Sequence, residues 1–154
     1  MGQELHYDET GAMGLVINRP TEVLPEEVLG DPGVLSGYEG PLFWGGPVEM
    51  GGMRVLMRSE SLPDGAAPII EDVHLVPFDD ALESLPADAA RVRLYIGYAG
   101  WAPGQLDGEL HTGSWDVRDA TGDVVFSADP RGLWDELVPV REYRTAMADE
   151  ALAL

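Results

Sequence analysis

The chain of 154 residues is strongly acidic, with a formal net charge of −19 at pH 7, and all nine of its basic residues are arginine. This charge repels phosphate backbones and anionic lipid surfaces, which argues against a nucleic-acid binder or a membrane-surface binder. The absence of cysteine excludes disulfides, a thiol nucleophile and thiolate metal ligands, and it fits a cytoplasmic protein. A single domain over residues 1–154 is expected at this length. A lysine-free acidic surface also suits a high-salt cytoplasm, so a halophilic source is a hypothesis.

The first predicted elements are a strand, a helix and a loop. The apolar run Ala12–Asn18 predicts a strand buried on both faces, which ends where Pro20 interrupts the ladder. Thr21 is the expected cap of a short helix over Val23–Leu29. The glycines and prolines of Gly30–Gly40 predict a loop.

The next segment predicts short strands separated by glycine turns. Pro41–Trp44 is an apolar strand that runs into the turn Gly45-Gly46-Pro47. Val48–Arg58 is expected to be a strand or a hairpin, with Gly51-Gly52 as its bulge or turn. Ile69–Val76 predicts one or two short strands. The three methionines of this region are interpreted as core residues, and they are Met50, Met53 and Met57.

A central strand and two helices follow. A capping box that begins at Asp80 predicts a helix that ends at Pro86. Arg91–Tyr98 has strand character, with the face that carries Leu94 expected to be buried and the opposite face only partly so. Pro103 favours the start of a short helix over Gly104–Leu110. Spacing four would bring three side chains of this region to one side, namely Trp101, Gln105 and Glu109.

The C-terminal part predicts a hairpin and helices. Ser114–Arg118 and Val124–Ser127 are expected to pair as strands, and Asp129-Pro130 opens a helical turn. From Val140 the apolar spacing predicts an amphipathic helix.

Three unusual motifs occur in one chain: GAMGLVINRPT from Gly11, GGPV from Gly45, and GYAGWAPGQL from Gly97, the last followed by Glu109 and Trp115. Through them the sequence resembles the YqgE/AlgH family, also catalogued as the uncharacterised protein family UPF0301 and as DUF179. The match extends from about His6 to Trp134. The resemblance implies an α+β fold with a mixed, strongly curved, barrel-like β-sheet and a few short helices. It implies a family core at about residues 6–137, with residues 138–154 as a helical tail.

The resemblance also implies a bacterial cytosolic protein without an established activity. Some family members carry a transcriptional-regulator label linked to alginate production. Direct DNA binding is not expected here, because the chain shows no helix-turn-helix and its charge is negative. Family members usually open with a further strand and loop ahead of His6. This opening is missing, so either the start is misplaced or truncated, or a sheet edge needs covering by the tail or by a dimer contact.

A ligand site is predicted where strand ends and glycine turns carry polar and aromatic side chains. Arg19 follows a buried strand and could reach a carboxylate or phosphate, or it could form a salt bridge within the chain. The glycine-rich loop after the central strand could cradle an anion, or it could make a tight corner with Trp101 filling the core. The predicted ligand-binding residues are Asn18, Arg19, Gly45, Gly46, Tyr98, Trp101 and Gln105.

No catalytic, metal or cofactor site is predicted. Asp107 and His111 are four residues apart, but no second pair of ligands accompanies them. Three functions stay open. The first is a non-catalytic ligand-binding or regulatory module. The second is a protein-interaction or assembly protein, with a homo-oligomer among the alternatives. The third, ranked last because no activated nucleophile or base is recognisable, is a hydrolase-like enzyme that would use Glu109, Asp107 or His111.

Overall fold

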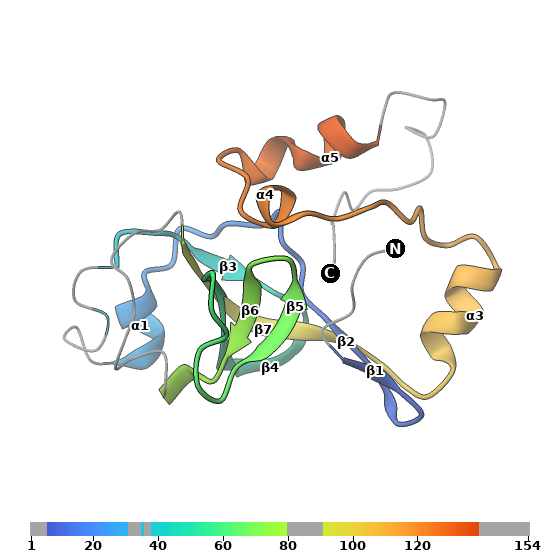
Figure 1. The fold of residues 1–154 in the computed structure, drawn as a ribbon, viewed down its shortest axis with the longest axis horizontal. Helices are drawn as coiled ribbons and strands as arrows, with labels where there is room; N and C mark the ends of the chain where they lie inside the picture. The colour runs from blue at the N-terminus through green and yellow to red at the C-terminus, as the bar shows by residue number, and fades with distance from the viewer. Residues whose placement is uncertain (1–5, 31–34, 36–37, 80–90, 139–154) are drawn as a thin grey trace.

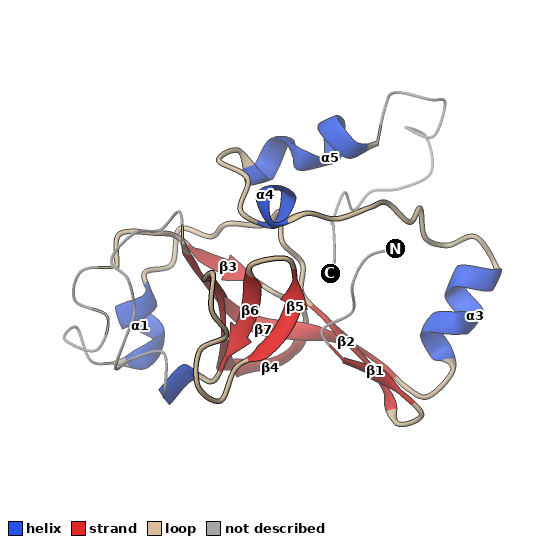
Figure 2. Cartoon of the chain, in the orientation of Figure 1, coloured by secondary structure: helices blue, strands red, loops and turns tan. Residues whose placement is uncertain are grey.

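Strand β7 (Val92–Trp101) lies at the centre of a curled sheet (Figures 1 and 2). The computed structural model describes residues 6–30, 35, 38–79 and 91–138. The other elements are β1 (His6–Asp8), β2 (Gly11–Gly14), α1 (Pro25–Leu29), β3 (Leu42–Trp44), β4 (Val48–Arg58), β5 (Ala67–Ile70), β6 (Val73–Val76), α3 (Gln105–His111), α4 (Gly122–Val125), the 3-10 helix η1 (Pro130–Gly132) and α5 (Leu133–Leu137).

The sheet has the order β1-β2-β7-β4-β6-β5, with all these neighbours antiparallel. Strand β3 pairs with β7 in parallel, at residues 94–96, and β2 pairs further along β7, at residues 99–101. One strand of ten residues therefore serves three partners, and the sheet curls around it into a half-barrel (Figure 2). The described residues thus form a mixed α+β fold with a strongly curled sheet and a few short helices, which confirms the predicted fold class.

Strand β4 is one continuous strand rather than a hairpin. Its register against β7 shifts between Val48 and Met53, on either side of Gly51-Gly52, as expected for a bulge at these glycines. The one or two strands predicted over Ile69–Val76 are two, because this range holds the end of β5 and all of β6, joined by a turn at residues 71–72. The predicted helix over Gly104–Leu110 is α3.

Three glycines allow backbones to cross at the middle of β7. Gly97 has φ +69°, which disfavours residues that carry a Cβ. A Cβ on Gly97 would overlap the carbonyl oxygen of Gly46, and a Cβ on Gly45 would overlap the carbonyl oxygen of Gly97. The Gly45 N–H donates to Ile96 O at 2.7 Å, which holds the segments together. We call Gly45, Gly46 and Gly97 the glycine crossing.

Both faces of β7 are buried from residue 92 to residue 97, so the expectation that one face of this stretch is only partly buried is wrong. Tyr95 has no exposed surface and packs in a core cluster with Phe43, Val125 and Leu133. The last two residues belong to the C-terminal helices, which cover this face of the sheet. The opposite face packs in a second apolar cluster around Leu94.

Buried Arg93 fastens the C-terminal segment to the sheet. Its guanidinium donates to Val125 O at 2.7 Å and also to Ser127 O. The same group lies 4.7 Å from the ring centroid of Phe43 and 5.4 Å from that of Phe126. A buried charge is tolerated when it is fully hydrogen-bonded, and here the acceptors are carbonyls at the end of α4.

A second contact holds α4 from outside the core. Arg58 on β4 donates to Asp72 at 2.8 Å and to Asp123 at 2.7 Å. The Gly122 N–H donates to Glu71 at 2.8 Å. The hydrogen bond from Arg58 holds the pKa of Asp72 below its usual value. The turn between β5 and β6 is therefore bound to the start of α4.

The predicted hairpin between Ser114 and Ser127 is wrong. Residues 114–121 form no regular element, and residues 122–125 form α4. The Thr121 side chain accepts the Val124 N–H at 3.3 Å, so this threonine caps a helix. The turn-like residues before Val124 favour a hairpin in the sequence, but in the fold Val125 belongs to a helical turn and packs in the same core cluster as Tyr95.

Three smaller expectations also need correction. The strand predicted over Ala12–Asn18 is regular only as far as Gly14, although the next three residues are buried. Thr21 does not cap α1, because its hydroxyl donates to Leu42 O at 2.8 Å and Leu24 occupies the cap position. Met50 is 45% exposed and does not fill the core.

Two predicted helices lie outside the described residues, namely the one that begins at Asp80 and the tail from Val140. Within the described part of the chain, no helix has the length and apolarity needed to cross a membrane.

Candidate functional site

Two tryptophan side chains donate hydrogen bonds to one carboxylate near the end of β7. The Trp101 indole N–H donates to Glu109 Oε2 at 3.1 Å, and the Trp115 indole N–H donates to the same oxygen at 2.9 Å. The two rings pack edge to face, with centroids 5.7 Å apart. Gln105 donates to Glu109 Oε1 at 2.9 Å. We call residues 101–115 the tryptophan arm.

The local sequence explains why the chain forms this arm. Gly104 adopts φ +72° and turns the strand into α3, and the Gln105 side chain accepts the Ala102 N–H at 3.0 Å. At the other end of α3, Gly113 adopts φ +73°. The Gly113 N–H donates to Leu110 O and the Ser114 N–H to Glu109 O, which is the glycine-terminated helix end known as a Schellman motif. This reversal brings the next residue, Trp115, back onto Glu109.

The arm lies at one end of the molecule, beyond the β1–β2 hairpin (Figure 1). Within the arm Leu106 is buried, whereas Leu110 is 38% exposed and Trp115 is 37% exposed; Val117, two residues beyond the arm, is 44% exposed. The arm therefore exposes apolar side chains, and the hydrogen bonds to Glu109 hold its backbone and tryptophan side chains in position.

Glu109 is an ionised anchor in this geometry. Hydrogen bonds from Trp115, Gln105 and Trp101, in that order of effect, hold the pKa of its carboxyl below the usual value. A carboxylate that accepts several N–H donors is stabilised in its charged form. Glu109 is consequently a hydrogen-bond acceptor for the two indoles and is deprotonated at neutral pH.

The seven predicted ligand-binding residues fall into three local sets in the described contacts. Trp101 and Gln105 meet at Glu109 in the arm. Gly45 and Gly46 lie in the glycine crossing, where a Cβ on Gly46 would overlap the backbone of Tyr98.

The third set is Asn18 with Arg19. Asn18 is buried, and the Arg19 guanidinium carbon lies 5.1 Å from the ring centroid of Trp44. The next residue, Pro20, accepts a hydrogen bond from Arg131 at 3.0 Å. This corner is therefore held by cation–π and carbonyl contacts.

Tyr98 is half-buried and makes a cation–π contact of its own. The Arg54 guanidinium carbon lies 5.3 Å from its ring centroid, and Arg54 also forms an ion pair with Glu49 at 2.8 Å. Tyr98 thus borders the crossing and contacts the side chain of a β4 residue.

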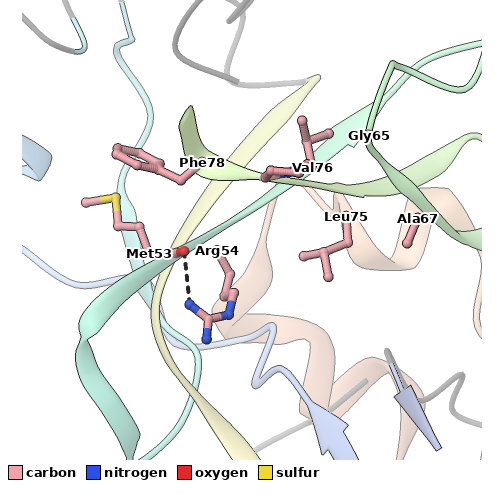
Figure 3. A pocket seen from close by; sticks show the side chains of 8 residues that line it. Met53, Arg54, Gly65, Ala67, Leu75, Val76 and Phe78 are labelled. Carbon is pink, nitrogen blue, oxygen red and sulfur yellow. Dashed lines mark hydrogen bonds between the residues drawn. The ribbon is translucent and has the colours of Figure 1, made fainter. Parts of the chain in front are cut away.

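An open hollow of about 300 Å³ lies elsewhere, over β4, β5 and β6 (Figure 3). Its lining is mostly apolar, and the Arg54 guanidinium donates to Met53 O at 3.2 Å within it. The lining residues are Met53, Arg54, Gly65, Ala67, Leu75, Val76, Pro77 and Phe78. None of the seven predicted site residues is among them.

Two aromatic residues of these sites were not predicted as site residues. In the sequence, Trp115 belongs to a family motif and Trp44 ends a predicted strand. Trp115 could have been found from Gly113, because a glycine just after a short helix indicates a chain reversal onto the last turn. No sequence signal pairs Trp44 with Arg19, because Trp44 ends β3 whereas Arg19 lies in the irregular segment between β2 and α1.

Asp107 and His111, which are four residues apart in the sequence, are both exposed on α3. Among the described residues, no group of three or more His, Cys, Asp or Glu side chains could hold a metal ion.

Comparisons with known proteins agree on one family. The family model described as AlgH-like (DUF179) matches residues 5–143. A UPF0301 protein of Streptomyces avermitilis is 37% identical over 150 residues, which cover 93% of this chain and 77% of that protein. A UPF0301 protein of Caulobacter vibrioides is 38% identical over 136 residues, which cover 83% and 70%. The solution structure of the AlgH protein from Pseudomonas aeruginosa is similar with a TM-score of 0.69 and 27% identity, covering 94% of this chain and 82% of that one.

Proposed function

This chain belongs to the AlgH-like family (DUF179), and we propose that it is a non-catalytic binding module that recognises a protein partner through the tryptophan arm. The observation that carries the proposal is the pair of tryptophans fixed on Glu109, with Trp115 more than one third exposed. Tryptophan is enriched where a few residues dominate protein–protein binding. A side chain that is already held in position loses less conformational entropy when a partner docks.

The chemistry of the arm favours binding over catalysis. A general acid or base works best with a pKa near the operating pH. The pKa of Glu109 is instead lowered, and its two oxygens already accept three N–H donors from side chains. This arrangement supports an anchoring role for the carboxylate.

Site-specific photocrosslinking in the organism that encodes the protein tests this function. A photoreactive residue at Val117, two residues after Trp115, is expected to give a discrete crosslinked product. The matched control is the same probe at Leu62, which is 54% exposed and lies in the turn between β4 and β5. The product should be absent at position 62 and should disappear in a Trp115→Ala background. Equal products at both positions, or a product that survives Trp115→Ala, would contradict the proposal.

The hollow over β4–β6 supports a second candidate, binding of a small apolar molecule. Its volume of about 300 Å³ is at the lower end of the range for small-molecule sites. Native mass spectrometry of protein purified without denaturation should then show an adduct that is lost when Ala67→Trp fills the hollow. Trp115→Ala should leave that adduct in place. If the protein purified from its own organism carries no adduct, this candidate is contradicted.

A further inference from the structure

The chemistry around the tryptophan arm indicates what kind of partner it can bind. Between Gln105 and Thr121 the sequence has four carboxylates and one arginine, namely Asp107, Glu109, Asp116, Asp119 and Arg118. Arg118 is itself paired with Asp116 at 2.6 Å. The exposed apolar side chains of the arm therefore belong to a segment of net negative charge, within a chain whose total charge is −19.

This charge discriminates between possible occupants. A second copy of the chain would bring the same negative surface to the contact, and like charges brought together oppose association. A nucleic acid would be repelled for the same reason. A positively charged protein segment would be attracted, and it would associate faster at low salt.

The exposed Trp115 ring favours arginine among the basic residues of a partner. Trp is the side chain that attracts a cation most strongly over its ring face, and arginine is the more frequent cation. The chain uses this contact internally, with Arg19 over Trp44 and Arg93 over Phe43. Leu110 and Val117, which flank Trp115 in the sequence, add exposed apolar surface for aliphatic side chains.

We infer that the occupant of the tryptophan arm is an arginine-containing basic segment of a protein, with apolar side chains between its cationic ones. An arginine guanidinium contacts the exposed Trp115 ring, and the net negative charge of residues 105–121 attracts the basic segment. This inference rests on the proposed function and adds the chemistry of the partner.

Three synthetic octapeptides test the inference by fluorescence anisotropy of a dye on the peptide. One alternates arginine and leucine, one alternates glutamate and leucine, and one alternates arginine and serine. The arginine–leucine peptide is expected to bind, the glutamate–leucine peptide not to bind, and the arginine–serine peptide to bind at least tenfold more weakly. Trp115→Ala should weaken binding of the arginine–leucine peptide at least tenfold, and Trp115→Phe should weaken it less.

A matched pair of charge variants separates specific docking from general attraction to an acidic protein. Asp116→Asn with Asp119→Asn removes two negative charges beside the arm and should weaken binding several-fold. Glu60→Gln with Asp64→Asn removes two exposed negative charges from the turn between β4 and β5, and it should leave binding unchanged. Circular dichroism would confirm that each variant is folded.

The inference is overturned by equal weakening in the two charge variants, by unchanged binding in Trp115→Ala, or by binding of the glutamate–leucine peptide. A concentration-dependent dimer that Trp115→Ala abolishes would identify a second copy as the occupant and would also overturn it. The crosslinking experiment at Val117 tests the proposed function separately from this inference. A specific crosslink to an acidic segment of a partner would support the proposed function and would refute the inference that the bound segment is basic.

Discussion

Replacing Gly97 by alanine should destabilise the fold more than replacing any glycine that has the same backbone conformation but open space around it. Gly97 has φ +69°, and an alanine in the left-handed region costs about 1–2 kcal/mol. Its Cβ would also overlap Gly46 O and lie 3.0 Å from Val48 O, and both of these are backbone atoms. Backbone displacement of this kind adds about 1–3 kcal/mol. The expected total loss is about 2–5 kcal/mol, a large share of the stability of a small domain.

Urea unfolding followed by circular dichroism measures this loss, and two further glycines provide controls. Gly104 has φ +72° but nothing within 4 Å of its would-be Cβ, so Gly104→Ala isolates the backbone strain. Gly108 lies inside α3 with neither strain nor crowding, so Gly108→Ala should stabilise the helix slightly. With an m value of about 2 kcal/mol/M, the urea midpoint should fall by about 1–2.5 M for Gly97→Ala and about 0.5–1 M for Gly104→Ala. Equal shifts for these two variants would refute the close approach of the backbones.

Three further predictions concern side-chain contacts and net charge. The folded-state pKa of Glu109 is lowered, so the stability that it contributes is complete above the ordinary glutamate pKa of about 4.3 and is lost as the pH falls through the lower folded value. Near-ultraviolet circular dichroism should therefore show the Trp115 environment changing in acid, and Glu109→Gln should remove that acid transition; an unchanged transition would contradict the anchoring role. Arg93→Lys should leave at least one of the carbonyls of Val125 and Ser127 unpaired, at about 1–3 kcal/mol, and hydrogen exchange should accelerate in α4 more than in β4. Equal acceleration of hydrogen exchange in α4 and β4 would show that Arg93 does not stabilise α4 locally. Finally, the melting temperature should rise steeply with sodium chloride, because salt screens a net charge of −19, and a flat response would show that self-repulsion is not limiting.

The sheet strands were largely predictable because their signals are local. Strand β7 is a run rich in β-branched and aromatic residues that ends in a glycine-rich turn, and both features are visible in the sequence. The burial of its second face was not predictable from that run. Tyr95 packs against Val125 and Leu133, which lie about 30 and 38 residues later in the sequence. Hydrophobic periodicity reports only on neighbouring residues, so it does not predict such a distant contact.

The error at α4 shows how a local pattern can favour the wrong element. Residues 124–126 are apolar and follow a turn-like sequence, so a strand was the natural prediction. In the fold, Thr121 caps a single helical turn and Arg93 binds the carbonyls at its end. The interaction that decides the outcome comes from a buried side chain on another element, and tertiary contacts of this kind override weak propensities.

The candidate residues separate into those that hold the sheet together and those that present a surface, and both groups depend on β7. Gly97 and Trp101 are four residues apart on this strand. The glycine crossing fixes the path of the strand, and the end of the strand carries the first indole of the arm. A change at Gly97 should therefore alter both stability and the tryptophan environment. A change at Trp115, which is 37% exposed and donates to Glu109, should abolish partner binding while lowering the urea midpoint less than a change at Gly97 does. Measuring both quantities on both variants distinguishes a binding surface from a purely structural aromatic cluster, because a purely structural role for Trp115 would lower the midpoint and leave partner binding unchanged.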